Sequence, residues 1–208
     1  MIPNQSLAVF LAAALALNIS PGPDMLYVIS QSLDQGRATG IASALGIGAG
    51  TLVHTMIAAV GLSALLISIP LAFNIIRYAG ALYLAYLGIK MILVKTRKDQ
   101  SVEPVSDEVC LRDAFRRGVT TNVLNPKVAL FFLAFLPQFV VRSEGGIMTQ
   151  FVMLGLLFDT SGTSVNIIVA LIAGRAGMSI REHSLLNRIQ KILPATILIG
   201  LAVLIVLS

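Results

Sequence analysis

Four ionisable side chains lie inside long apolar stretches of this sequence: Asp24, His54, Lys127 and Asp159. Counted from the charged flanks of their stretches, Asp24 and Lys127 are each about 15 Å deep, near the middle of a bilayer. His54 and Asp159 also fall near the middle of theirs. Ionisable groups at one depth in a membrane indicate a functional site. A structural Asp–Lys pair between two helices is the alternative, but it leaves the second aspartate and the histidine unexplained.

These groups suit the binding of a small zwitterion and the movement of a proton. Lys127 and the partial positive charge of a helix N-terminus attract a carboxylate. Either Asp24 or Asp159 can meet an ammonium group. With one lysine and two aspartates, one carboxylate has no lysine to pair with. That carboxylate can bind either the ammonium group or a proton, so competition for it would couple the movement of the zwitterion to that of the proton.

The two aspartates have different settings. Asp24 follows Pro23 at the start of a predicted half-helix, where the N-terminal partial charge keeps a carboxylate ionised. Asp159 lies within an unbroken stretch with hydroxyl neighbours, where loss of hydration favours the neutral form. We therefore expect Asp159 to carry the proton and Asp24 to form the binding site. His54 is a further candidate for proton coupling, although a lone histidine of this kind is more often a hydrogen-bonded core residue.

Two of the apolar stretches are interrupted by helix breakers at matching positions. Proline lacks an N–H group and clashes with the preceding turn, so each pattern predicts a break in the middle of the membrane. Such a break must be buried in protein or line a cavity, because unpaired backbone is costly in hydrocarbon. A packed proline kink explains one break, but two matching breaks favour a shared binding site. Its candidate residues are Asn18, Pro21, Gly22, Pro23 and Asp24 at the first break, Asn122, Asn125, Pro126 and Lys127 at the second, and Asp159 and Thr163. Asp159, Gly162, Thr163 and Asn166 share one helical face.

Six apolar stretches are long enough to be transmembrane helices, which need about 20 residues each. They are about Ser6–Leu33, Gly40–Ile69, Ile75–Val94, Val119–Val141, Ile147–Ala173 and Ile192–Leu207. We expect an all-α integral membrane protein in which the first and fourth helices are broken at mid-membrane. Each half of the chain, with one broken helix, has three spans. Because three is an odd number, the two halves have opposite orientations in the membrane. This pattern predicts two inverted three-helix repeats, typical of secondary transporters.

These elements form one expected domain over residues 1–208. The first repeat covers about 5–95, a cytoplasmic linker about 96–117, and the second repeat about 118–208. We expect the linker to contain a short helix that ends at Gly118, because glycine commonly ends helices.

Composition and charge exclude most other classes of protein. Hydrophobic residues make up 56% of the chain and charged residues 12%, too few charges for the surface of a soluble domain. Twelve of the 15 basic residues fall on one side of the predicted membrane, and Arg77 and Arg142 alone on the other. This bias predicts that the basic side is cytoplasmic and that both termini lie outside. The net charge of +5 therefore reflects topology, and we expect no nucleic-acid partner.

Cysteine usage and the start of the chain limit the options further. The one cysteine, Cys110, excludes a disulfide within the chain and a cysteine-based metal cluster. The first residues carry no positive side chain, so we expect no cleavable signal peptide. There is no Gly-x-x-x-x-Gly-Lys-Ser/Thr motif for ATP. We expect no cofactor and no metal site.

The residues around both breaks also resemble a known family. The sequence is similar, over nearly its whole length, to the lysine-exporter superfamily and within it to the homoserine/threonine exporter (RhtB) branch. The matching segments are Asn18 to Asp24, Gly36 to Gly48, Tyr78 to Lys90, Phe115 to Gly118, and Asn122 to Phe139. The segment Leu193-Pro194-Ala195-Thr196 departs from the family pattern, which affects the expected packing of the last span. The resemblance implies a six-span exporter of amino acids in the bacterial inner membrane, driven by protons.

Two alternatives stay open. A cation or metal exporter of the same superfamily needs several converging ligands, and two aspartates with one histidine make a thin set. An intramembrane enzyme needs a nucleophile beside a base, which Ser161 or Ser164 with His54 and Asp159 could supply. We expect instead an exporter, by proton antiport, of small amino acids such as threonine, homoserine or leucine. Its partners are the amino acid, protons and the lipid bilayer, and a homodimer is compatible with the sequence.

Overall fold

The computed structural model describes residues 4–68, 78–83 and 110–176, with residues 75, 85, 86, 89, 196, 199, 200 and 203. Within these residues every regular element is a helix, as expected for an all-α protein. The elements are α1 (Asn4–Ile19), α2 (Pro23–Gln35), α3 (Arg37–Ile57), η1 (Ala58–Leu62), α4 (Ser63–Ser68), α6 (Leu111–Val123), α7 (Pro126–Leu130), η2 (Phe131–Phe135), η3 (Leu136–Phe139), η4 (Arg142–Glu144) and α8 (Ile147–Ala176).

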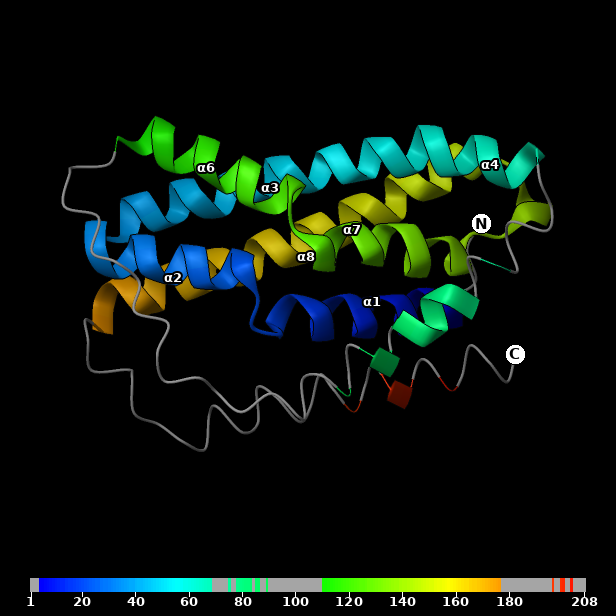
Figure 1. Cartoon of the computed structure of the whole chain (residues 1–208), viewed down its shortest axis with the longest axis horizontal. Helices are drawn as coiled ribbons and strands as arrows, with labels where there is room; N and C mark the ends of the chain where they lie inside the picture. The colour runs from blue at the N-terminus through cyan, green and yellow to red at the C-terminus, as the bar shows by residue number, and fades with distance from the viewer. Residues whose placement is uncertain are drawn as a thin grey trace.

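Four long helical segments lie side by side in a bundle (Figure 1). Arg37–Leu65 and Ile147–Arg175 are each long and apolar enough to cross a membrane. Ser6–Ile19 with Pro23–Gln35 and Leu111–Val123 with Pro126–Phe139 also pass this test as pairs, bent by 49° and 45°. The two bent pairs are the first and fourth predicted spans, so both predicted breaks are present.

The two bent pairs run in opposite directions along the bundle (Figure 1), as inverted repeats require. The third and sixth predicted spans, about 75–94 and 192–207, lie mostly outside the described residues. The six-span inverted-repeat arrangement therefore stays a prediction.

The start of the fourth span differs from the prediction. α6 begins at Leu111 and passes through Gly118 to Val123, so the expected short helix ending at Gly118 is wrong. Gly118 does not have the positive φ of a helix-ending glycine. A Cβ atom there would lie 2.5 Å from the carbonyl oxygen of Ser43. This glycine therefore serves the close approach of α6 to α3.

α3 is in close contact with both α6 and α8. A Cβ atom at Gly46 would clash with the backbone of Phe115 in α6. On the α8 side, a Cβ atom at Gly48 would lie 2.5 Å from Oγ1 of Thr163. Small residues on both sides of α3 thus let two helices approach its backbone, which is how membrane helices pack without a hydrophobic driving force between them.

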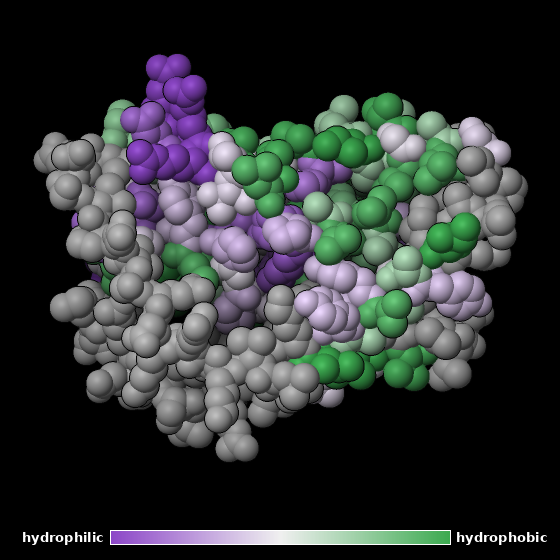
Figure 2. All heavy atoms as spheres, in the orientation of Figure 1, coloured by the Kyte–Doolittle hydropathy of each residue, from purple (hydrophilic) through white to green (hydrophobic). Residues whose placement is uncertain are grey.

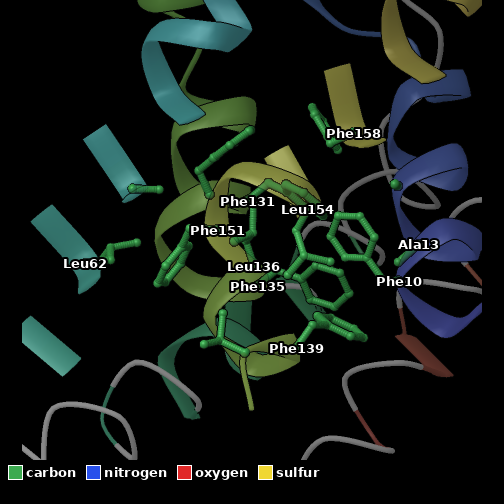
Figure 3. Packing of buried hydrophobic residues seen from close by; sticks show 14 of the residues in the cluster. Phe10, Ala13, Leu62, Phe131, Phe135, Leu136, Phe139, Phe151, Leu154 and Phe158 are labelled. Carbon is green, nitrogen blue, oxygen red and sulfur yellow. The ribbon is translucent and has the colours of Figure 1, made fainter. Parts of the chain in front are cut away.

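An aromatic core fills the end of the bundle beyond the breaks (Figure 3). The rings of Phe131 and Phe158 stack with centroids 4.5 Å apart, and those of Phe10 and Phe139 meet edge to face at 5.3 Å. Pro137 lies where the π-helical η2 gives way to the 3₁₀-helical η3, because proline cannot continue the α-helical hydrogen bonds. This core connects the second broken pair to α1 and α8.

The packing of α3 predicts the effect of a single added methyl group. Gly46→Ala should destabilise the protein by about 1–3 kcal/mol, as overpacked sites do, because the new Cβ meets the backbone of Phe115. Gly61→Ala is the matched control, since a Cβ at Gly61 meets nothing within 4 Å. Thermal unfolding in detergent measures both. Equal melting temperatures for the two variants would show that the α3–α6 contact is not this tight.

Candidate functional site

The two breaks place an acid and a base at matching positions. α2 begins at Pro23 and α7 at Pro126, and each proline occupies the first turn of its half-helix, where its missing N–H group costs nothing. Asp24 and Lys127 each follow their proline directly. Each therefore lies at the N-terminus of a half-helix, in the middle of a bent pair.

Lys127 satisfies the backbone of the opposite break. Its Nζ atom donates hydrogen bonds to the carbonyl oxygens of Leu17 and Ser20, both at 2.7 Å. These carbonyls lie at the end of α1, where a helix carries partial negative charge. The oxygen of Leu17 also accepts a hydrogen bond from the backbone N–H group of Ser20 at 3.2 Å. The lysine chain also runs past Gly22, whose added Cβ would lie 3.4 Å from both Cδ and Nζ. The charge of Lys127 is thus engaged in closing the first break.

Asn122 connects the second break to Asp24 and to α3. It is 1% exposed, and its Nδ2 donates to Oδ2 of Asp24 at 2.9 Å. The hydroxyl of Thr51 lies 3.4 Å from the Asn122 side-chain oxygen, and Nε2 of His54 lies 3.1 Å from its backbone oxygen. Because a carbonyl only accepts, Nε2 of His54 carries the hydrogen. His54 therefore supports Asn122 in this structure, and its role in proton coupling stays a prediction.

Two other asparagines fix the ends of the half-helices. Oδ1 of Asn125 accepts from the backbone N–H group of Lys127 at 3.0 Å, which makes Asn125 the N-cap of α7. Nδ2 of Asn18 donates to Oγ of Ser161 at 3.0 Å and to the carbonyl oxygen of Phe158 at 3.3 Å. Asn18 thus ties the end of α1 to α8.

A small cavity of about 30 Å³ lies between the two breaks. Oδ1 of Asp24 is buried and has no hydrogen-bond partner in the described part of the chain. The volume holds about one or two water molecules, which is too little space for an amino acid. The cavity is lined by Leu17, Asn18, Ser20, Gly22, Asp24, Met25, Asn125, Lys127, Val128, Phe158 and Asn166.

Several residues of the predicted site line this cavity or lie next to it. Asn18, Gly22, Asp24, Asn125 and Lys127 line it. Asn122 reaches it through Asp24, and Pro21, Pro23 and Pro126 lie at the breaks that frame it.

Asp159 and Thr163 lie apart from this cavity. Thr163 donates to Oδ1 of Asp159 at 3.2 Å, and both side chains lie against Gly48 of α3. Asn166, on the same face of α8, does line the cavity, although the candidate residues did not include it. Asn166 follows Asp159 by seven residues, and this spacing is the sequence pattern that indicates a shared helical face.

The role of Lys127 predicts a loss of stability when its charge is removed. Lys127→Met removes the ammonium group that donates to the carbonyl oxygens of Leu17 and Ser20, which should cost about 1–3 kcal/mol. Arg112→Met is the control, because it removes an exposed positive charge from α6. Thermal unfolding in detergent compares them. A Lys127→Met protein as stable as the control would mean that the first break does not depend on this lysine.

Comparisons with known proteins agree with a transporter. The family model described as LysE type translocator matches residues 15–208. The chain is 37% identical over 123 residues to an uncharacterized membrane protein of Pseudomonas aeruginosa, covering 58% of this chain and 57% of that protein. It is 28% identical over 183 residues to an uncharacterized membrane protein of Vibrio cholerae, covering 88% of each. No solved structure matches the chain. Since the family model covers all but residues 1–14, this chain belongs to the LysE type translocator family of membrane transporters.

Proposed function

We propose that this protein is a secondary active transporter of the RhtB branch that exports small zwitterionic amino acids in exchange for protons. Membership of the LysE type translocator family supports efflux of amino acids or related substances. The observation that carries the finer proposal is the buried Asp24, whose Oδ1 has no hydrogen-bond partner in the described part of the chain. Asp24 and Lys127 both line a small cavity between the two broken helices.

In this proposal the ammonium group of the substrate binds Oδ1 of Asp24. The substrate carboxylate binds the N–H groups at the start of α2. It also competes with the carbonyl oxygens of Leu17 and Ser20 for the ammonium group of Lys127. Gly22 allows the substrate close to the backbone. Because the cavity holds about one or two waters, the half-helices must separate before an amino acid enters. Movement of one bent pair against the other then gives alternating access.

Asp159 is the proposed proton carrier. It lies outside the cavity and accepts one hydrogen bond from Thr163. Its side chain meets α3 at Gly48, so a change in its charge acts on the packing of α8 against α3. Asp24, in contrast, is held by Asn122 at a helix N-terminus.

The described residues support neither alternative function, a cation or metal exporter or an intramembrane enzyme. Among the described residues, no group of three or more His, Cys, Asp or Glu side chains comes together to hold a metal ion. Ser161 donates to the carbonyl oxygen of Phe158 and His54 contacts Asn122. In the part of the chain that the structure describes, no serine is therefore hydrogen-bonded to His54.

Efflux from proteoliposomes tests the proposed function. Vesicles loaded with one amino acid from a panel should lose threonine-, homoserine- or leucine-like substrates faster than protein-free vesicles do. An inwardly directed proton gradient should accelerate the loss. If no amino acid leaves faster than the control, or if divalent cations leave instead, the proposal is wrong.

The orientation is tested at Cys110. The start of α3, the start of α6 and the end of α8, which carry Arg37, Arg112, Arg116, Arg117 and Arg175, lie at one end of the bundle (Figure 1). This end should face the cytoplasm. Cys110 is exposed and free, so a membrane-impermeant thiol reagent should label it in opened cells but not in sealed ones. Rapid labelling of sealed cells would reverse the orientation.

Gly22 tests the close approach of substrate to the first break. Gly22→Leu should abolish export while the protein still inserts, because its side chain must enter the space beside Lys127. Gly22→Ala is the graded control, since its Cβ would only touch the lysine at 3.4 Å. Transport is measured together with abundance in the membrane. Normal transport by Gly22→Leu would make the break a packing feature.

The proton assignment is tested on one variant with two assays. Asp159→Asn mimics a permanently protonated carboxyl group. It should lose efflux driven by a pH gradient but keep substrate exchange, because exchange needs no net proton transfer. If Asp159→Asn still drives uphill efflux, the assignment fails, and if Asp24→Asn shows the split instead, the two roles are exchanged.

A further inference from the structure

A second cavity, of about 700 Å³, lies along α6 at the basic end of the bundle. Most of its described lining residues come from α6, at spacings of three or four residues that keep them on one helical face. The others are Leu124, directly after α6, and Tyr27 of α2. The lining residues are Tyr27, Asp113, Arg116, Arg117, Thr120, Thr121 and Leu124. Hydrophilic side chains gather over the start of α6 (Figure 2). We call this cavity the α6 groove.

The charges of the α6 groove are available to a ligand. Arg116, Arg117 and Asp113 are exposed, and none of the three has a hydrogen bond or ion pair from its side chain in the described part of the chain. The hydroxyls of Thr120 and Thr121 donate to backbone oxygens of their own helix at 3.1 and 2.8 Å, so their lone pairs stay open to a donor. A role in topology explains the positive charge here, but it does not require the charges to line a cavity with an acid and two hydroxyls.

We propose that the α6 groove is an entry site that binds the zwitterionic amino acid before it reaches Asp24. A guanidinium group binds a carboxylate through two parallel hydrogen bonds. Asp113 lies one helical turn before the arginine pair, where it can meet the ammonium group of the same molecule. The volume is within the range of small-molecule sites, about 300–1,000 Å³, whereas the cavity at Asp24 is far smaller. This inference rests on the proposed function and orientation.

Tyr27, which lines the α6 groove, also joins α2 to α6. The hydroxyl of Tyr27 donates to the carbonyl oxygen of Ala114 at 3.0 Å, joining α2 to α6. Tyr27 lies three residues after Asp24 on α2, and Arg117 precedes Asn122 by five residues, about 7.5 Å along the helix. A molecule held by the arginines is therefore one to two helical turns from the Asp24 carboxylate.

The first test measures transport kinetics from the cytoplasmic face, in inside-out vesicles. The double variant Arg116→Gln/Arg117→Gln should raise KM about tenfold, the loss of one charged bidentate contact, with Vmax unchanged. Arg112→Gln is the matched control, because Arg112 is exposed on the same helix and does not line the groove. A decarboxylated analogue should compete equally well against both proteins. An unchanged KM in the double variant would overturn the entry site, whereas a wild-type protein that moves no amino acid would overturn the proposed function instead.

The second test keeps both arginines. Thr120→Cys in a Cys110→Ser protein should react with a thiol reagent from the cytoplasmic face, and amino acid should slow the reaction at least threefold. The protection should persist when Asp24→Asn abolishes transport, because the groove binds first. Arg112→Cys should show no protection. If anionic lipid protects Thr120→Cys and amino acid does not, the groove is a lipid site and the proposal is wrong.

Discussion

The helix α1 ends in the middle of an apolar bundle, where its last turn cannot satisfy all of its own carbonyl oxygens. In hydrocarbon such groups must be satisfied from within the protein. Lys127 supplies both hydrogen bonds from the start of α7. The return connection is made by Asn122, which binds the carboxylate of Asp24 at the start of α2. Each break is therefore completed by a residue of the other, and neither pair can move without exchanging these bonds.

This mutual dependence explains why the polar groups gather in one place. Asn122 is fixed by Thr51 and His54 of α3, and α3 approaches α6 closely because glycines replace larger residues at the contact. On one side of the breaks, the stacked rings of Phe131 and Phe158 fill the bundle. On the other side, the α6 groove reaches the basic end. On that side a smaller apolar cluster of Val28, Ala44, Ile47 and Ala170 packs α2, α3 and α8 together.

The breaks were predictable from the sequence because proline has few places in a membrane helix, and Pro23 and Pro126 begin half-helices as expected. What could not be predicted are contacts between residues far apart in the chain. Counting residues from the charged flank predicts that Lys127 lies near the middle of the membrane. That count does not show that Lys127 binds carbonyl oxygens of α1. Nor does depth show that Asp159 lies apart from Asp24. Gly118 has the residue type of a helix end, and only its packing against Ser43 shows that it continues the helix.

The opposite charges of Asp24 and Lys127 mean that neither break can replace the other. A site made from two identical copies of one half would bring two aspartates, or two lysines, to the same cavity. Two like charges at such short range repel strongly in a medium of low dielectric constant, and the donor or acceptor that each break needs would be missing. The two breaks therefore have to carry different residues, one that supplies a donor and one that supplies an acceptor.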